Sequence, residues 1–586
     1  MNTLDLAIVA VYLLSALAIG LAVTKKASQG SEEYFLAGRS LPWWLAGTSM
    51  VATTFAADTP LAVTGLVASG GIAGNWVWWC VGIAHVVTAV LFARWWRRLE
   101  VVTDAEIMER RYTGKAAPAL RLVKAGYAAI LVNCLTMGWV ILAMRKVCTV
   151  LFPEQDPLLL TFGLMALAVL YSSLGGMRSV VLTDLAQFGL ALFGACLLCF
   201  IVVRDEGGLS GLVAGLHEAY PDRAGSMLAF LPEGDLPGLP ITLFAVLLSV
   251  GWWRQAEGSG YIMQRLGASS TPQDAERAAI WFAVLHNAIR PWPWILVGLA
   301  ALVVYPLTMD VDREATYAML LVDRLPAGAL GLMIASLLAA FMSTIDTHVN
   351  WGSSYVVRDL WLRFVDPQAS PRRQVLVGRI AVVLLGALAA IASLGMNDIA
   401  SVWLFVIMLG SGLGSVSLAR WLWWRVNAAA ELTALVASSL LALAIVLLGN
   451  AAVFGVDNPL FWQEIPTQTR ILVVAFGSLA CWIPVTLVTQ PDGPEMLDAF
   501  YRQVRPWGFW GPVAERNPGL TEPMGLLPLR LVAGLLSVFG TLFGLGGLLL
   551  EVNKLPWLAL ALVGLGSFAW MMWSTSPDAQ KASDRG

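Results

Sequence analysis

The chain has 586 residues, of which 58% are hydrophobic and only 13% are charged, and its mean hydropathy is +0.72. A water-soluble protein carries about twice that charged fraction, so most of this protein's surface is expected to face lipid. The net charge of -2, from 37 basic and 39 acidic residues, excludes the basic footprint that nucleic-acid binding requires.

Continuous apolar runs of about 20 residues predict membrane-spanning helices. Fifteen such runs are present, and their continuity excludes a β-barrel, whose strands alternate in polarity. The sequence therefore predicts an all-α polytopic membrane protein of about fifteen spans. The runs lie at 4–23, 43–70, 75–95, 118–151, 158–174, 179–203, 239–266, 278–305, 328–357, 374–395, 400–423, 429–449, 471–489, 527–550 and 555–574.

The charges of the loops indicate how the chain is oriented. Lys25 and Lys26 directly follow the first run, and basic residues are typical of cytoplasmic loops. The loops after runs three and nine are also basic, whereas the loops near 154–156, 205–235 and 310–314 are acidic. This pattern predicts a multi-pass protein of the cell membrane with its N-terminus outside, and the odd number of spans places its C-terminus in the cytoplasm.

The second run is interrupted at mid-span. Pro60 lacks an N–H and its ring clashes with the carbonyl four residues earlier, so regular helix is expected to fail over 54–58. The carbonyls near Ala52 and Phe55 then lose their helical partners. Asp58 falls at the same place, where a carboxylate costs about 2.5–3.5 kcal/mol on the insertion scale.

The seventh run is interrupted as well, because Gly251, Gly258 and Gly260 surround Arg254 and Glu257. Irregular backbone at membrane depth is tolerated only where it lines a cavity or is buried in protein. Two broken helices at corresponding positions of two halves point to the midplane binding site of a transporter. A simple proline kink with internal ion pairs is the alternative interpretation of each break taken alone.

The spacing of the runs predicts four segments. Runs two to six and runs seven to eleven each hold five spans, and an odd number per block gives the blocks opposite topology. The predicted parts are an N-terminal extra helix (1–30), a first inverted repeat (43–204), a second inverted repeat (239–425) and accessory C-terminal spans (429–586).

The ninth run carries a cluster of oxygen donors. Ala340, Ser343 and Thr344 are spaced i, i+3 and i+4, so they share one helix face. Together with carbonyls freed in the second run they supply about five neutral oxygens, which suit a hard monovalent cation such as sodium. The other interpretation is that the two hydroxyls bond back to the carbonyls one turn earlier.

Four segments resemble the sodium:solute symporter family, which includes sodium/proline, sodium/pantothenate and sodium/glucose transporters. They are YFLAGR at 34–39, GGMRSVVLTDLAQ at 175–187, QRLGA at 264–268, and the stretch 339–359 that begins AAFMST. The likeness covers about residues 1–425 and follows the order of spans in the family.

The resemblance implies a leucine-transporter-type fold of five-plus-five inverted repeats with one extra N-terminal helix. It implies a sodium site formed by the carbonyls of Ala52, Phe55 and Ala340 and the hydroxyls of Ser343 and Thr344. Sodium is therefore the expected coupling ion.

The resemblance also assigns a residue and limits the solute. Asp184 matches a family acidic residue placed near the path by which sodium leaves. The stretch 253–257 does not match the sugar-transporter pattern of the family, which puts a sugar in doubt. An amino acid or organic acid is favoured instead, as the solute of a sodium-coupled symporter that works by alternating access.

Arg254 and Asp58 are the residues that favour an amino acid or organic acid as the solute. Arginine forks onto a carboxylate, and Asp58 in the partner break could receive an amine. Arg254 and Glu257 are spaced i, i+3 and could instead neutralise each other. The candidate solute-binding residues are Thr54, Asp58, Thr59, Asn133, Arg254, Gln255, Glu257 and Ser259.

Several alternatives remain open from the sequence. A proton-coupled carrier of the same fold would use Asp58, Asp184 or His348, and a sugar or polyol symporter and a transporter-like sensor keep the same architecture. His85, His286 and Arg290 are interpreted as packing residues. No paired catalytic motif indicates an enzyme, and no P-loop indicates ATP-driven transport. The expected partners are a small solute, sodium and the lipid bilayer, with the monomer as the functional unit.

Overall fold

A computed structural model describes residues 2–27, 36–174, 177–233, 238–258, 260–448, 465–520 and 525–575. These residues form helices joined by turns and short loops, and no named β-strand occurs among them. The all-α prediction is therefore confirmed.

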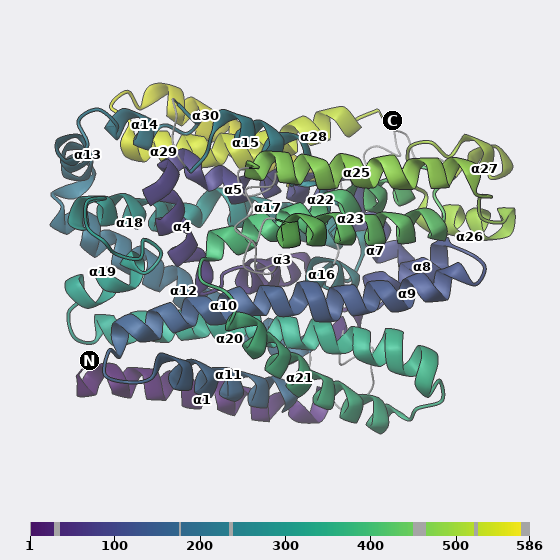
Figure 1. Ribbon diagram of the computed structural model, residues 1–586, viewed down its shortest axis with the longest axis horizontal. Helices are drawn as coiled ribbons and strands as arrows, with labels where there is room; N and C mark the ends of the chain where they lie inside the picture. The colour runs from purple at the N-terminus through teal and green to yellow at the C-terminus, as the bar shows by residue number, and fades with distance from the viewer. Residues whose placement is uncertain are drawn as a thin grey trace.

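The helices of the first half lie mainly along one common direction (Figure 1). In chain order they are α1 (Thr3–Ala27), α3 (Trp43–Thr53), α4 (Asp58–Gly70), α5 (Trp76–Trp79), α6 (Val81–Val87), α7 (Ala93–Leu99), α8 (Ile107–Arg111), α9 (Ala116–Gly126), α10 (Asn133–Leu151), α11 (Pro157–Leu174), α12 (Met177–Asp205), α13 (Gly208–Ala219) and α14 (Ala224–Leu228).

The second half follows the same direction. Its helices are α15 (Ile241–Val246), α16 (Tyr261–Ala268), α17 (Pro272–Val284), α18 (Pro291–Val304), α19 (Thr316–Arg324), α20 (Ala329–Tyr355), α21 (Pro371–Ser393), α22 (Ile399–Leu422), α23 (Ala428–Leu448), α25 (Thr467–Val488), α26 (Pro494–Val504), α27 (Gly511–Arg516), α28 (Leu527–Leu535), α29 (Thr541–Leu550) and α30 (Leu555–Ser574).

Short segments of other helix types join or interrupt these α-helices. The 3₁₀ segments are η1 (Ala37–Arg39), η2 (Ile72–Asn75), η4 (Asp104–Glu106) and η7 (Trp253–Gln255). The π segments, which in other proteins often mark functional sites, are η3 (Thr88–Phe92), η5 (Tyr127–Val132), η6 (Leu247–Gly251), η8 (Leu285–Ile289), η9 (Val356–Val365) and η10 (Leu536–Gly540).

The predicted spans fall on these helices. Eleven continuous helical stretches among the described residues are long and apolar enough to cross a membrane, and the pair α3 and α4, bent by 60°, makes a twelfth. Two shorter apolar helices lie within α1 and α11. The remaining predicted run, 239–266, is divided by its break into α15, η6, η7 and α16.

The two ends of the bundle carry different connections. Figure 1 places α13, α14 and α19 together at one end and α8, α26 and α27 at the opposite end. We call these the α19 end and the α8 end. The described parts of the acidic loops predicted outside lie at the α19 end, and the basic loops after runs three and nine lie at the α8 end (Figure 1).

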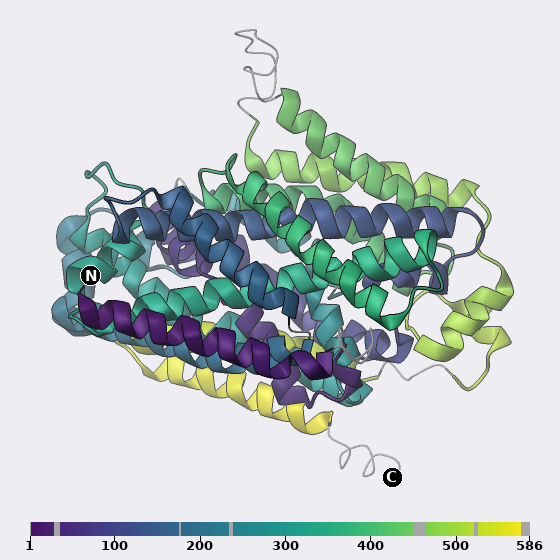
Figure 2. The same ribbon diagram turned by 90° about the horizontal axis from the view of Figure 1, so that it is seen from below.

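The accessory helices cover two different parts of the bundle. η10 and α30 pack on α17, and α28 packs on α6 and η3, whereas α23 and α25 pack on α22. Figures 1 and 2 show α29 and α30 on the side of the molecule opposite α11 and α21. An indole N–H of α18 donates to a carbonyl of α29, from Trp292 to Leu542 at 3.1 Å.

Candidate functional site

The first break lies where the proline predicts it. α3 ends at Thr53 and α4 begins at Asp58, with Pro60 in the first turn of α4, where its missing N–H costs nothing. The carbonyl of Ala52 accepts from the N–H of Phe55, three residues later, at 3.0 Å. This bond replaces the usual α-helical bond from the N–H four residues later. A carbonyl oxygen has two lone pairs, so that bond leaves one for another ligand.

α20 lies beside this break and donates a hydroxyl to it. Thr344 Oγ1 lies 2.9 Å from the carbonyl of Thr53 and 3.1 Å from the carbonyl of Ala340. The bond back to Ala340 expected of a membrane threonine is thus present together with a bond to the broken helix. The sequence did not single out Thr53, whose carbonyl joins the two elements.

Ser343 takes part through a third helix. Its hydroxyl donates to Asp184 Oδ1 of α12 at 2.5 Å, and Ser49 of α3 donates to the other carboxylate oxygen at 2.6 Å. All three residues are buried. The structure therefore brings α3, α12 and α20 together around a group of hydroxyl, carbonyl and carboxylate oxygens, which is the donor chemistry of a hard cation.

The second break spans residues 252–260, between η6 and α16. Gly258 and Gly260 have φ angles of 70° and 73°, which residues with a Cβ rarely adopt. Glu257 does not pair with Arg254. Its carboxylate forms an ion pair with Arg420 of α22 and accepts from the Trp421 indole at 2.9 Å.

Arg254 is left to face a cavity. A Cβ on Gly410 would lie 2.0 Å from Arg254 Cδ, and one on Gly414 would lie 2.6 Å from its backbone N, so two glycines of α22 make room for it. Among the residues that the structure describes, none forms a hydrogen bond or an ion pair with its guanidinium. Arg254 is half-buried because the cavity remains beside it.

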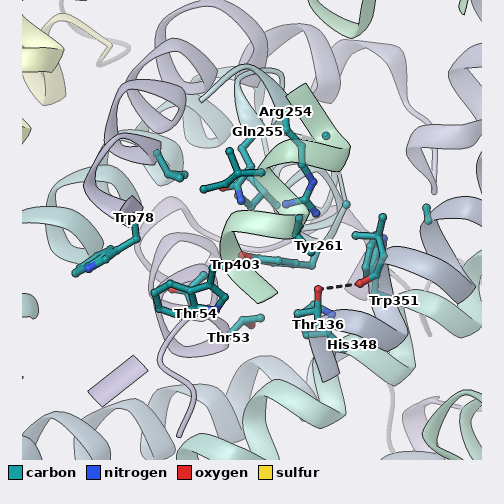
Figure 3. Close-up of a pocket in the computed structure, with 18 of the residues that line it drawn as sticks. Thr53, Thr54, Trp78, Thr136, Arg254, Gln255, Tyr261, His348, Trp351 and Trp403 are labelled. Carbon is teal, nitrogen blue, oxygen red and sulfur yellow. Dashed lines mark hydrogen bonds between the residues drawn. The ribbon is translucent and has the colours of Figure 1, made fainter. Parts of the chain in front are cut away.

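The cavity has a volume of about 280 Å³ and lies between the two breaks. In Figure 3, Arg254 and Gln255 stand opposite Thr53 and Thr54, with Tyr261 between them. Such a volume is at the low end for ligand pockets and suits a small solute. Six of the candidate residues line it: Thr54, Asp58, Thr59, Arg254, Gln255 and Glu257.

A seventh candidate, Asn133, does not line the cavity itself. The Asn133 side chain lies behind His348, donating to its carbonyl at 2.9 Å and lying 2.6 Å from its Nδ1. His348 does line the cavity, so Asn133 holds a lining residue in place. Ser259 lies outside the described residues.

Three residues interpreted as packing from the sequence also line the cavity: His85, His286 and Arg290. His286 Nδ1 lies 2.8 Å from the Thr54 hydroxyl, and Arg290 donates to the same hydroxyl at 3.2 Å. A signal was present, because His286 and Arg290 are spaced i, i+4 and share a face of the eighth run.

Aromatic side chains form much of the remaining lining. They come from α5, η5, α10, α16, α20 and α22. Trp78, Trp403, Tyr261 and Trp351 are among those shown in Figure 3. The cavity thus combines an apolar aromatic surface with a few charged groups.

The cavity extends toward the α8 end, because Asp104 of η4 and Lys124 of α9 line it there. At the opposite end, Glu314 connects three helices. Its carboxylate accepts from Lys146 Nζ of α10 at 2.7 Å and from the Ile399 N–H of α22 at 2.9 Å, and Gly65 of α4 packs against its side chain. Burial first, and then the nearby Asp398, raises the pKa of Glu314 to about 7 despite the bond from Lys146.

A transporter with two broken helices, a midplane cavity and a nearby group of oxygen donors is the class that the geometry defines. The family model of the sodium:solute symporter family matches residues 34–437. The chain belongs to this family.

Known proteins agree with this assignment. The chain is 25% identical over 468 residues to the sodium/glucose cotransporter of Vibrio parahaemolyticus, covering 75% of this chain and 84% of that protein. It is 25% identical over 411 residues to the sodium/sialic acid symporter SiaT of Proteus mirabilis, covering 67% and 78%. The solved structure of a Na⁺-coupled sialic acid symporter superposes with a TM-score of 0.66 at 20% identity, covering 84% of this chain and 99% of the other.

These findings establish the coarse function. The protein is a multi-pass membrane transporter with the leucine-transporter-type fold, and it is a sodium-coupled symporter rather than an enzyme. Its coupling ion is sodium, and its partners are sodium and a solute.

Proposed function

We propose that the protein uses the sodium gradient to import a small amino acid or organic acid. The observation that carries this proposal is the Arg254 guanidinium, which faces the cavity without a partner among the described residues. Leaving a cation unpaired at membrane depth is costly unless an anionic group of a ligand pairs with it. The planar fork of arginine fits a carboxylate.

An amine on the solute has a partner across the cavity. Asp58 lines the cavity from the first break, and its Oδ1 has no hydrogen-bond partner among the described residues. A zwitterion would place its carboxylate at Arg254 and its ammonium toward Asp58. Thr54, Thr59, Gln255 and Glu257 complete the proposed solute site, with Asn133 acting through His348.

Sodium would bind at the first break. The proposed ligands are the carbonyls of Ala52, Phe55 and Ala340 and the hydroxyls of Ser343 and Thr344. The hydrogen bond from Thr344 to the Thr53 carbonyl supports this placement, because it already brings α20 to the broken end of α3. Asp184, bonded to Ser343, would lie on the path by which sodium leaves.

Transport would follow from coupling between the two sites. Sodium joins α3 and α20 and so orders the first break, which lowers the cost of ordering the cavity around the solute. The coupling is reciprocal, so the solute raises the affinity for sodium by the same factor. Closure at the α19 end and opening at the α8 end would then release both into the cytoplasm.

The proposed orientation and segments complete this scheme. The α19 end would face outside together with the N-terminus, and the C-terminus would face the cytoplasm of a cell-membrane protein. The two repeats would be 43–204 and 239–425, flanked by the helix at 1–30 and the accessory spans at 429–586. A monomer contains all the proposed ligands.

A sugar symporter is the second candidate, because relatives named for glucose transport match most of the chain. The name of the sialic acid symporter indicates an acidic sugar, which would also suit Arg254. A proton-coupled carrier would use Asp58, Asp184 or His348, and a sensor would bind a solute without moving it.

Uptake into proteoliposomes tests these candidates. The panel contains neutral amino acids, organic acids and sugars, each measured with an inward gradient of sodium or of potassium. We expect sodium-dependent uptake of an acid and a loss of about tenfold or more in Arg254→Gln, since a charge-assisted pair is removed. Thr149→Ala, an exposed change near the end of α10, serves as the control.

Two results would contradict the proposal. Equal uptake with sodium and potassium would contradict the proposed sodium site at the first break. Sodium-driven uptake of a neutral sugar that persists in Arg254→Gln would assign the cavity to sugars.

A further inference from the structure

A buried arginine that the transport scheme does not use stands beside the proposed sodium site. Arg265 lies in α16, just after the second break, and is 1% exposed. It donates from Nη2 to Thr347 Oγ1 of α20 at 2.8 Å and to Thr53 Oγ1 of α3 at 3.3 Å. Its Nε donates to Ser49 Oγ of α3 at 3.3 Å.

Arg265 shares a carboxylate with a proposed sodium ligand. Its Nη2 lies 3.7 Å from Asp184 Oδ2, and Ser343 donates to Asp184 Oδ1. Ser49 donates to Oδ2 as well, so two hydroxyls and one guanidinium surround this fully buried carboxylate.

Thr53 is a second link between Arg265 and the proposed sodium ligands. Its hydroxyl receives a hydrogen bond from Arg265, and its carbonyl receives one from Thr344. The guanidinium and the proposed sodium ligands therefore meet on two residues, Asp184 and Thr53. A sodium ion bound by Ser343 and Thr344 would share the Asp184 carboxylate with the Arg265 guanidinium. The two cations would lie in a low-dielectric interior, where like charges repel strongly.

Two effects follow from this arrangement, and both favour release of the ion. Removing sodium from a buried site strands its carboxylate unless another cation neutralises it. Arg265 is already tethered within reach of Asp184 and can do so without leaving α16. The same charge lowers the affinity for arriving sodium, which helps the ion to leave.

We propose that Arg265 is a positioning residue that acts as a tethered counter-cation and sets the affinity of the sodium site through Asp184. This inference rests on the proposed placement of sodium at Ser343 and Thr344. A purely structural role, in which Arg265 only crosslinks α16 to α3 and α20, would not make the affinity for sodium depend on its charge.

The test measures how uptake in proteoliposomes depends on the sodium concentration. In Arg265→Gln we expect half-maximal uptake at about tenfold lower sodium and a lower maximal rate, because the ion is held more tightly and leaves more slowly. Arg265→Lys, which keeps the charge, should stay within about threefold of the wild type. Arg204→Gln removes an exposed arginine at the far end of α12 and should change neither quantity.

A second comparison starts from the carboxylate instead of the guanidinium. Asp184→Asn removes the carboxylate that the guanidinium shares with the proposed sodium site and leaves Asp346 as another carboxylate near Arg265, so half-maximal uptake should need more than tenfold more sodium. Adding Arg265→Gln to Asp184→Asn should recover most of that loss. Binding of sodium to the purified protein, followed by the thermal shift that it causes, gives the same ranking without transport.

The outcomes separate this inference from the proposed function. If Arg265→Gln needs as much sodium as the wild type or more, or if the double variant equals Asp184→Asn, the counter-cation role is overturned. If Ser343→Ala and Thr344→Ala also leave the sodium dependence unchanged, the proposed sodium site itself is wrong.

Discussion

The two broken helices are held open by different chemistry. At the first break, neutral oxygens meet directly where the hydroxyl of Thr344 donates to the carbonyl of Thr53, and the nearest charges, Arg265 and Asp184, reach this strip through the hydroxyls of Thr53 and Ser49. The second break is held by full charges. Glu257 forms an ion pair with Arg420, and the carboxylate of Asp104 accepts the Gly260 N–H at 3.1 Å.

The difference matches two different tasks. Neutral oxygens bind a monovalent ion weakly enough for it to leave, so a break lined by them suits an ion that must be released. Buried ion pairs are costly to separate, so a break fixed by them forms a rigid base. From that base Arg254 projects into the cavity, which gives the solute a fixed positive charge to meet.

The largest expected effect comes from breaking the charged support. Arg420 is fully buried between Glu257 and Glu431, with its Nη1 2.6 Å from Glu431. Arg420→Met leaves both carboxylates buried, with Lys124 at 3.4 Å from Glu431 and the nearby Arg111 as remaining cations. We expect a loss of about 3–5 kcal/mol in the free energy of unfolding, measured by denaturant titration of the purified protein.

A pair near the surface provides the matched control. Arg516 lies 2.7 Å from Asp498, and its side chain is 40% exposed. Arg516→Met should cost less than about 1 kcal/mol, because water already screens that pair. An equal loss in the two variants would mean that the second break does not depend on its buried charges.

The next largest effect concerns α4, the second half of the first broken helix, which packs against the ionisable side chain of Glu314. The pKa of Glu314 is raised from 4.5 to about 7, first by burial and then by Asp398. The folded carboxyl therefore keeps its proton over a range in which the unfolded one has lost it. The stability from this group is complete below about pH 4.5 and is lost as the pH rises through about 7.

Glu314→Gln cannot ionise and removes this dependence. The difference in unfolding free energy between wild type and Glu314→Gln should fall by about 2–3 kcal/mol from pH 4.5 to pH 7 and then stay level. Thermal unfolding at half-unit pH steps measures it, with the exposed Glu218→Gln as a control that should follow the wild type. A difference that rises with pH would show that the Lys146 contact outweighs burial.

The sequence located both breaks but only part of what surrounds them. Pro60 and the glycines at 258 and 260 are local signals, because they act on the backbone of their own helix. The partner of Glu257 is not local. The sequence leaves a pair with Arg254 open, whereas the structure supplies Arg420, which lies 163 residues further along the chain.

The cavity shows the same limit. His286 lies in the π segment η8 and Arg290 directly follows it, and the wider π turn changes which side chains of a helix face inward. Apolar periodicity gives no sign of such a turn, so both residues are interpreted as packing from the sequence. Thr54, predicted as a cavity candidate, does line the cavity, because its position depends only on the break beside it.

The smallest of these effects tests the neutral break itself. Thr344→Ala removes one hydroxyl from the proposed sodium ligands and its hydrogen bond to the Thr53 carbonyl. Loss of one neutral ligand should raise the sodium concentration for half-maximal uptake by about tenfold, which corresponds to about 1.4 kcal/mol. The control is Ser336→Ala on the same helix, whose hydroxyl donates to Ala191 of α12 at 3.3 Å. If both variants shift the sodium dependence equally, the effect belongs to the packing of α20, and the contrast between a neutral and a charged break loses its functional meaning.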